Sequence, residues 1–350
     1  MTRMIRQSMV AYATPLCETV AEAPEPRGTE VLVRISRCGV CHSDLHLYDG
    51  YFSLGGDKKL DVTAFRTLPF TLGHEIAGVV ERAGPDADVK TGASAAVFPW
   101  IGCGQCASCK AGEENLCAAP RHLGIQVDGG FATHVLVPHP RYLIDHGALP
   151  ASLAGAYMCS GLTAFAALKR LTEHAQRGPI LLVGLGGVGM MGLAFALALF
   201  PHKPIVADID PVKREAALRV GAAAAYDPAD PNARKALLKA TGGVAGAVDF
   251  AGTDGSLSFA VGSIGKGGKV VITGLIGGSF ATPIAMFPLK AMAIEGTMTG
   301  TLAEAEEMMA LARAGKIPSV PIFERPLSAA QASLDDLRAG KVVGRVVLVP

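Results

Sequence analysis

Hydrophobic and polar positions divide the chain into two stretches with different periodicities. Up to about residue 150, short runs of apolar and β-branched residues are bounded by Gly or Pro, as at residues 31–35, 76–80 and 131–137. Such runs are typical of β-strands, and no long segment there has the 3.6-residue period of a helix. We therefore predict an irregular β domain for this stretch.

From about residue 160 the pattern changes to alternating strand and helix signals. Apolar runs predict strands at Ile180–Val183, 204–208, 245–250 and 269–273, and helices at 189–200 and Pro211–Val220, the latter ended by Gly221. Alternation of this kind predicts a parallel sheet with helices on both faces, so the fold class is α/β with a doubly wound sheet. The last residues, 341–349, return to a strand pattern.

One long run, between Arg177 and Lys203, carries no charged residue and is long enough to span a bilayer. It contains six glycines from Gly178 to Gly192, and four of them fall at 184–189, in the middle of the run. A spanning helix would be weakened by glycines at that place, whereas a buried strand, a turn and a buried helix accommodate them. We therefore interpret the run as part of the α/β core.

Composition limits the class of protein. A length of 350 residues favours two domains. Hydrophobic residues make up 50% and charged residues 18%, which excludes a disordered chain. A net charge of +1 and a single Trp give no surface for nucleic acid or for anionic membrane. The N-terminus lacks the apolar segment of a signal peptide, so we expect a cytoplasmic protein.

Four of the eight cysteines lie within fifteen residues, at Cys103, Cys106, Cys109 and Cys117. In a chain with no export signal, such a cluster favours metal ligands over disulfides. Four thiolates suit a closed tetrahedral zinc site that stabilises a loop without its own core. An iron–sulfur cluster is the alternative, but the ferredoxin spacing has three residues before its last cysteine and a proline after it. Here there are seven residues, and Ala118 follows.

A glycine-rich turn predicts a dinucleotide site. Gly184, Gly186, Gly187 and Gly189 follow the strand at Ile180–Val183 and precede a helix, and Asp208 follows Gly189 by 19 residues. This context matches the Rossmann fingerprint, in which the backbone approaches a pyrophosphate at the helix N-terminus. The carboxylate of Asp208 would bind the adenosine ribose hydroxyls and repel a 2′-phosphate, which favours NAD over NADP. The alternative is a structural glycine turn in an unrelated α/β domain.

Three dispersed segments could supply a second, open metal site. They contain Cys41-His42-Ser43-Asp44, Gly73-His74-Glu75 and Cys159-x3-Thr163. Each is weak alone, since an isolated buried Cys or His is usually structural. In this order, with the four-cysteine lobe, the glycine turn and a late Gly344-Arg345, they resemble the zinc-dependent medium-chain alcohol dehydrogenases over nearly the whole chain.

The resemblance implies a fold, two zinc ions per subunit and NAD. It implies a GroES-like catalytic domain at 1–159 and 299–350, with a zinc lobe at about 100–120, and a Rossmann domain at 160–298. Cys41, His74 and Cys159 would hold a catalytic zinc, with Glu75 beside it as an occasional ligand and Asp44 orienting His74. The matching cofactor contacts are His42, Thr163, Gly184, Gly186, Gly187, Val188, Gly189, Asp208, Lys213, Gly274, Ile276 and Arg345.

The implied reaction is the reversible NAD-dependent oxidation of an alcohol to an aldehyde or ketone. Zinc would lower the pKa of the bound alcohol, and Ser43 and His46 would carry its proton to solvent before hydride transfer. A zinc-free quinone or enoyl reductase would lack the metal-binding residues, and a zinc-binding interaction module would not use the glycine turn. A homotetramer is typical of relatives with the zinc lobe, and a dimer is the alternative.

Two features concern the substrate, a small molecule. The 32 residues between Cys41 and His74 exceed the usual family interval, and the extra segment, 49–61, is expected either to reshape the pocket mouth or to form a solvated loop. Trp100, Phe52 and Leu123 predict an apolar pocket for a medium-sized or bulky apolar or aromatic alcohol. A specialised dehydrogenase of polyols or other secondary alcohols is the alternative, and Cys159 disfavours polyols because their dehydrogenases usually carry a carboxylate there.

Overall fold

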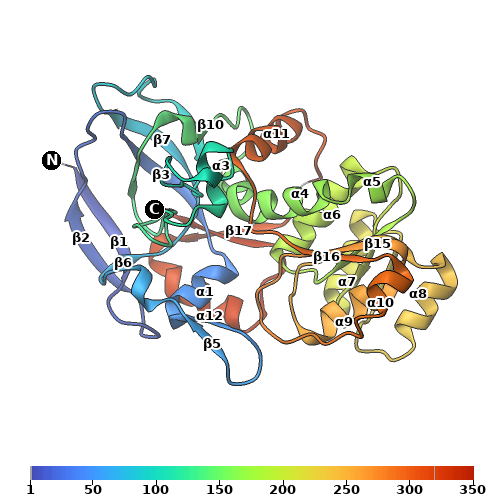
Figure 1. Cartoon of the computed structure of the whole chain (residues 1–350). Coiled ribbons are helices and arrows are strands. Elements are labelled where there is room, and N and C mark those ends of the chain that lie inside the picture. Colours follow the sequence, from blue (N-terminus) through green and yellow to red (C-terminus); the bar gives the residue numbers. More distant parts are fainter. Residues whose placement is uncertain (1, 319) are drawn as a thin grey trace.

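The computed structural model describes residues 2–318 and 320–350, which form two parts side by side (Figure 1). The first part holds both chain ends and most of the antiparallel strands. The second part consists of a parallel sheet covered by helices. The cleft that concerns function lies where the two parts meet.

The first part contains two larger sheets, in which every strand pair except that of the last two strands of the chain is antiparallel. In one, the order is β2 (Cys17–Glu22), β1 (Arg3–Met9), β6 (Phe70–Thr71). In the other, the order is β10 (Leu143–Ile144), β8 (Ser94–Val97), β7 (Glu75–Ala83), β3 (Val31–Gly39), β18 (Arg345–Val349), β17 (Ile322–Pro326), and β9 (His134–Val137) also pairs with β3. A small hairpin is formed by β4 (Tyr51–Ser53) and β5 (Lys59–Asp61). The irregular β domain expected from the sequence is confirmed.

The second part is a six-stranded sheet in which every strand pair is parallel. Its order is β13 (Ala224–Tyr226), β12 (Ile205–Ala207), β11 (Ile180–Val183), β14 (Val244–Asp249), β15 (Ile264–Ile272), β16 (Ala293–Gly296). The strand order reverses beside β11, which is the doubly wound arrangement in which dinucleotides bind at the switch point. The Rossmann fold is therefore confirmed.

Helices surround both parts. They are α1 (His42–Asp49), α2 (Ala107–Lys110), α3 (Ala151–Ala156), α4 (Leu162–Lys169), α5 (Thr172–Ala175), α6 (Gly187–Leu199), α7 (Pro211–Val220), α8 (Ala233–Thr241), α9 (Asp254–Ser263), α10 (Met286–Lys290), α11 (Leu302–Arg313) and α12 (Ala330–Arg338). Short 3₁₀ turns occur at Thr63–Phe65, Glu114–Leu116, Pro140–Tyr142 and Leu327–Ala329.

The uncharged run forms β11, a turn and α6, as the sequence indicates. Helix α6 begins at Gly187, two residues before the predicted start, because Gly186 is its N-cap. Its Phe195 is fully buried and its ring contacts those of Tyr157 and Phe165, so α6 packs against the helix that joins the two parts. The absence of charge reflects burial on all sides.

That joining helix is continuous from Ala151 to Lys169, through α3, a π-helical turn at Tyr157–Gly161 and α4. Among the described residues it is the one helix whose length and composition would suffice to cross a membrane, and 89% of its apolar window is buried in the protein. Burial of this kind is what a core helix of a globular protein shows. It runs across residue 159, where we propose that the first part ends.

The chain returns to the first part near its C-terminus. Strand β18 pairs antiparallel with β3, and β17 pairs parallel with β18. Helix α12 packs against α1. We propose that the second crossing between the parts lies at residue 298/299.

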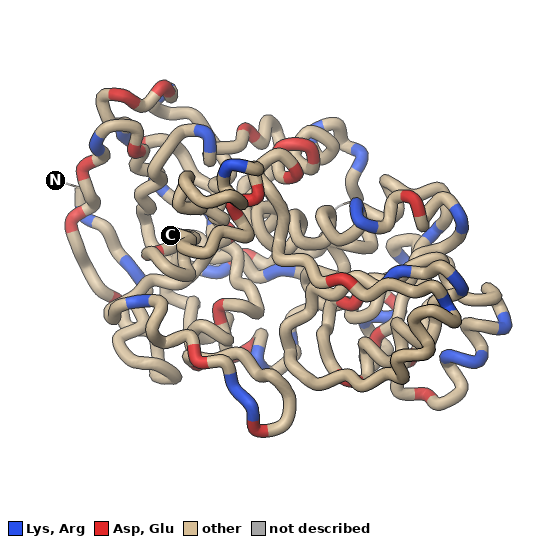
Figure 2. The backbone as a smooth tube through the Cα atoms, in the orientation of Figure 1, with Lys and Arg blue, Asp and Glu red and all other residues tan. Residues whose placement is uncertain are grey.

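Charged residues are distributed over both parts without a large region of one sign (Figure 2). This agrees with the net charge of +1. The distribution offers no electrostatic track for a polyanion.

Candidate active site

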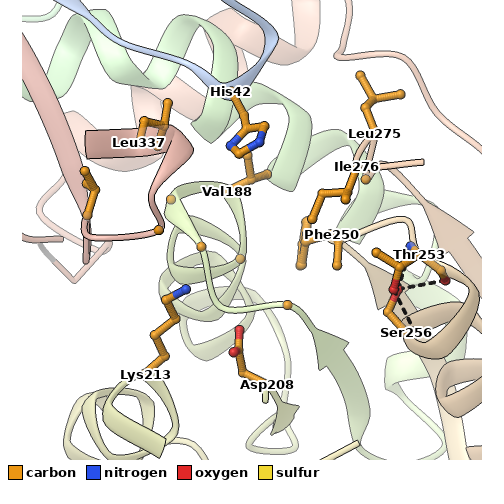
Figure 3. Close-up of a pocket in the computed structure, with 18 of the residues that line it drawn as sticks. His42, Val188, Asp208, Lys213, Phe250, Thr253, Ser256, Leu275, Ile276 and Leu337 are labelled. Atoms are coloured by element: carbon orange, nitrogen blue, oxygen red, sulfur yellow. Dashed lines mark hydrogen bonds between the residues drawn. The ribbon is translucent and has the colours of Figure 1, made fainter. Parts of the chain in front are cut away.

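A cleft of about 460 Å³ lies between α1, α12 and β18 of the first part and the carboxyl ends of the parallel strands of the second. Figure 3 shows His42 entering it from the first part, while Val188, Asp208 and Lys213 approach from the second. The predicted site residues that line it are Cys41, His42, Ser43, His46, Gly184, Gly186, Gly187, Val188, Gly189, Asp208, Lys213, Gly274, Ile276 and Arg345. The cleft therefore gathers most of the expected cofactor contacts in one place.

The glycine turn has the geometry that a pyrophosphate requires. Gly184 has a φ of 88°, and a Cβ placed on Gly189 would lie 1.8 Å from the carbonyl oxygen of Gly184, so both positions need glycine. A Cβ on Gly186 would meet no atom of the described chain within 4 Å, because this residue faces the open cleft. The N-terminus of α6 thus presents its backbone N–H groups to a space that an anionic group can fill.

Asp208 lies at the end of β12 and is buried, but it lines the cleft. Its carboxylate accepts hydrogen bonds from the backbone N–H groups of Leu185, at 2.6 Å, and Asp210, at 2.9 Å. These bonds fix the carboxylate beside the glycine turn. A fixed negative charge there suits ribose hydroxyls and opposes a phosphate.

A second group of side chains meets below the cleft, where the sulfur atoms of Cys41 and Cys159 lie 3.8 Å apart. One donor atom each from Cys41, His74, Glu75 and Cys159 falls within 4.8 Å of the others, and all four residues are buried. Three segments position them. Cys41 is the N-cap of α1, Glu75 begins β7 with His74 directly before it, and Cys159 lies in the π-helical turn, a feature frequent at functional sites.

The imidazole of His74 is oriented by Asp44. Its Nδ1 lies 3.2 Å from Oδ1 of Asp44, and the other Asp44 oxygen accepts the backbone N–H of Cys41 at 2.8 Å. Both ring nitrogens of His74 are buried without a hydrogen-bond partner in residues 2–318 and 320–350, so Nδ1 has only the contact with Asp44 and Nε2 is free. An imidazole held by a carboxylate at one nitrogen, with its other nitrogen free, is the usual arrangement of a metal ligand.

Glu75 forms a buried ion pair with Arg345 through its Oε1 atom. Its Oε2 atom is buried and has no hydrogen-bond partner in the described chain. Burial raises the pKa of Glu75 to about 7, although the Arg345 guanidinium opposes the shift. The free Oε2 atom therefore lies next to the sulfur and imidazole donors, in a position from which a carboxylate can coordinate a metal.

These observations fit a zinc ion. Two sulfurs, one imidazole and a neighbouring carboxylate match the ligands that zinc prefers at sites that keep one position open. The hydrogen bond shared with Cys159 lowers the pKa of the Cys41 thiol and raises that of Cys159. Burying polar nitrogen and oxygen atoms without hydrogen-bond partners, next to two close sulfurs, costs free energy of folding. A cation bound to all of these atoms would remove that cost.

Helix α1 presents His42, Ser43 and His46 to the cleft directly after Cys41, one of the candidate metal donors. Ser43 and His46 are three residues apart, so they share a face of the helix. The rings of His42 and His46 have centroids 5.6 Å apart. Burial lowers the pKa of both imidazoles, which keeps them neutral and able to accept a proton near neutral pH.

The four-cysteine lobe is a separate cluster. The sulfur of Cys106 lies 3.5 Å from that of Cys109 and 3.8 Å from that of Cys117, and the sulfurs of Cys103 and Cys109 are 4.0 Å apart. Backbone N–H groups of Cys103 and Ala119 donate to the sulfur of Cys117. All eight cysteines are free, so no disulfide holds the lobe, and its four sulfurs suit a tetrahedral metal site.

Apart from the metal-donor residues, four predicted cofactor and substrate residues lie outside the lining of the cleft, as the described residues define it. Thr163 is half-buried on α4, one turn after Cys159. Trp100 is buried with its ring 5.6 Å from His74, and its indole N–H donates to the carbonyl of Met158. Leu123 is buried beside a second cavity, and Phe52 packs on His46 at 4.7 Å between ring centroids. The apolar pocket expected from these side chains stays a prediction.

The cleft also contains residues that the sequence patterns did not single out. Phe250, Thr253, Leu275 and Leu337 are lining residues. Phe250 and Thr253 follow β14, and the carboxyl ends of parallel strands are where ligands bind in such sheets. Inspection of the residues that follow each predicted strand would therefore have identified Phe250 and Thr253 from the sequence. Leu337 is on α12 and has no comparable signal.

Comparison with known proteins identifies two matched regions. Residues 27–146 match the alcohol dehydrogenase GroES-like domain, and residues 187–314 match the zinc-binding dehydrogenase family. An NAD-dependent alcohol dehydrogenase of Sulfurisphaera tokodaii is 34% identical over 348 residues, covering 98% of this chain and 99% of that protein.

Two further similarities concern structure and substrate. The crystal structure of the alcohol dehydrogenase from Aeropyrum pernix has a TM-score of 0.85 and 28% identity, covering 99% of this chain and 100% of that one. A D-arabinose 1-dehydrogenase (NADP(+)) of Saccharolobus solfataricus is 29% identical, covering 97% of this chain and 95% of that protein.

Metal analysis of the purified protein tests both clusters. We expect two zinc ions per chain, one for each group of donors. Cys159→Ala and Cys106→Ala should each leave about one, because a site that loses one sulfur of its donor set binds zinc far more weakly. Cys17→Ala, at an exposed cysteine outside both clusters, should keep both ions. One zinc or none in the unmodified protein would contradict the assignment.

Proposed function

The chain belongs to the zinc-dependent medium-chain alcohol dehydrogenases, and we propose that it reversibly oxidises a medium-sized or bulky apolar alcohol, primary or secondary, to an aldehyde or ketone with NAD. One observation carries the proposal. One cleft brings together the glycine turn of the Rossmann sheet and the buried donor set of Cys41, His74 and Cys159. Cys41, Ser43 and Arg345 all line this cleft.

When bound, zinc supplies a Lewis acid at the buried donors and NAD supplies the hydride acceptor in the cleft. The chain's own residues bind the cofactor, orient its nicotinamide ring and move a proton. The N-terminus of α6 and the guanidinium of Arg345 offer positive charge to the pyrophosphate, and Asp208 offers a carboxylate to the ribose. Val188, at the start of α6, provides an apolar surface for the nicotinamide ring.

Proton removal is the task that we assign to Ser43 and His46. Ser43 follows Cys41 by two residues, so its hydroxyl starts from the metal-binding end of α1 and faces the cleft. His46 lies one turn further and is half-buried, and its lowered pKa favours the neutral base. Ser43 accepts the proton of the alcohol while passing its own toward His46, which exchanges it with solvent.

The proposed substrate class is supported by the apolar lining of the cleft. Val40, Val188, Phe250, Leu275 and Ile276 are apolar residues that line it. Such walls favour hydrocarbon over hydroxyl groups, because a sugar hydroxyl would be buried there without a partner. A sugar is the second candidate, since one relative is named for D-arabinose.

An activity panel with NAD tests the substrate class. We expect medium-length aliphatic and aromatic alcohols to give kcat/KM values at least about tenfold above that of D-arabinose, since apolar walls lose affinity for each buried hydroxyl. Reduction of the corresponding aldehydes and ketones with NADH serves as the reverse measurement. If D-arabinose or another pentose gives the highest kcat/KM, the proposed apolar alcohol is wrong and a sugar is the substrate class.

Replacement of Asp208 tests the choice of cofactor. Asp208→Gly removes the charge that opposes a 2′-phosphate, so the ratio of kcat/KM for NADP to that for NAD should rise about tenfold or more, equivalent to one charge-assisted hydrogen bond. Asp88→Gly, at an exposed position of the first part, is the matched control. An unchanged ratio in Asp208→Gly would remove the ribose role from this residue.

Replacement of Ser43 tests the proton path. Ser43→Ala should reduce kcat by about a hundredfold or more, the usual contribution of a positioned proton-transfer group. Zinc content and NADH binding should stay as in the unmodified protein, because Ser43 is neither a metal donor nor part of the glycine turn. Ser328→Ala, an exposed serine, controls for the loss of a hydroxyl. Full activity of Ser43→Ala would exclude it from the path.

A further inference from the structure

The β4–β5 hairpin starts where α1 ends. Gly50, with a φ of 82°, caps α1 through its N–H bond to the carbonyl of His46, and Tyr51 then opens β4. Three residue pairs form the hairpin ladder, and its turn is closed by hydrogen bonds from Leu54 N–H to the carbonyl of Lys58 and from Lys58 N–H to that of Gly55. The hairpin is therefore an ordered continuation of the helix that carries Ser43 and His46.

The tip of this hairpin reaches the other part of the protein. In Figure 1 the β5 hairpin extends beside the loop that follows β15. A Cβ placed on Gly55 would lie 2.7 Å from the carbonyl carbon of Gly278 and 3.0 Å from the backbone nitrogen of Ser279. A Cβ on Gly277 would lie 2.6 Å from the carbonyl oxygen of Ser53. The two backbones are in direct contact, with no room for a side chain between them.

The loop that receives the tip is fixed to the nucleotide-binding sheet. The N–H groups of Ile276 and Gly277 donate to the carbonyls of Ala251 and Gly252, at 3.2 and 3.0 Å. The N–H of Ser279 donates to the carboxylate of Asp254 at 2.5 Å. Three hydrogen bonds in four residues make this loop a firm support.

The base of the hairpin is equally well held. Phe52 packs on His46 with ring centroids 4.7 Å apart, and Asp49 forms an ion pair of 2.7 Å with Arg338 of α12. A movement of the tip is therefore transmitted to α1 through Phe52 and through the backbone. The hydrogen bond between Gly50 and His46 connects the end of α1 to the start of the hairpin.

We propose that the β4–β5 hairpin is an interdomain strap that positions the proton-transfer helix α1 over the cofactor cleft, with Gly55 and Gly277 as the positioning residues. The inference rests on the proposed function, since it takes Ser43 and His46 as the proton path. Hydride transfer requires the alcohol on the metal of one part to meet the nicotinamide on the other, and a misplacement of 1 Å can cost about a hundredfold. NAD exchange then requires the Gly55 contact to open.

The chain provides a matched pair of variants. Gly55 and Gly56 are neighbours in the same turn and both have positive φ, 90° and 56°, so alanine strains the backbone at each. Only at Gly55 does the added methyl group meet the facing loop, because at Gly56 it would meet no described atom within 4 Å. The difference between Gly55→Ala and Gly56→Ala therefore reports the contact and not the turn.

We expect Gly55→Ala to slow hydride transfer in a single turnover by about tenfold or more relative to Gly56→Ala, because the parts are displaced. The NADH dissociation rate, followed by stopped-flow fluorescence, should increase in Gly55→Ala and stay unchanged in Gly56→Ala. Trypsin should also cut at the exposed Lys58 and Lys59 faster in Gly55→Ala, since the tip has lost its support. Zinc content should be equal in both variants.

Equal hydride-transfer rates, NADH dissociation rates and trypsin cleavage in the two variants would overturn the strap. If Gly55→Ala loses zinc or fails to fold, Gly277→Ala introduces the same clash from the facing loop and decides the question. Failure of the unmodified protein to oxidise any alcohol while it binds NADH would instead contradict the proposed function. The two failures are distinguishable because NADH release is measured without alcohol.

Discussion

The buried ion pair between Arg345 and Glu75 is the interaction on which the arrangement of the site depends. A charge removed from water is tolerated only with a partner, and each of these two groups is the other's partner. Glu75 lies beside the sulfur and imidazole donors, and a Cβ on Gly187 would lie 2.6 Å from the guanidinium of Arg345. The pair therefore links the metal-binding donors to the glycine turn, and burial holds both ends in place.

This pair also explains why the chain returns to its first part. Arg345 begins β18, and β18 reaches the donors only because it pairs with β3, which pairs in turn with β7 where Glu75 lies. This sheet thus places the C-terminal strand β18 beside β3 and β7 of the N-terminal segment, under the cleft. Removal of either charge would leave the other buried and unpaired, so the C-terminal strand belongs to the active site as much as to the sheet.

Local features of the sequence predicted a large part of this structure. The glycine turn and Asp208 obey a spacing that backbone geometry enforces, and the four clustered cysteines are visible as a group because they lie within fifteen residues of sequence. Cys41, His74 and Cys159 are far apart along the chain, and only the resemblance to a known family predicted that they form one metal site. The Arg345–Glu75 pair and the π-helical turn at Cys159 depend on tertiary packing, as does the contact of Phe52 with His46. No periodicity or motif carries that information, because it depends on where side chains point after the sheets have formed.

The extra segment between Cys41 and His74 shows how an insertion acquires a function in such a fold. Its sequence suggested a reshaped pocket mouth or a solvated loop, two alternatives that stay predictions, and the structure adds that its tip contacts the second part. The receiving loop supplies Gly274, Leu275 and Ile276 to the cleft and then Gly277 and Gly278 to the hairpin. These five consecutive residues thus include both a wall of the cleft and the support of the strap. Because these residues are consecutive, we expect a displacement of Leu275 or Ile276 to reach the Gly277 contact and, through the hairpin, α1.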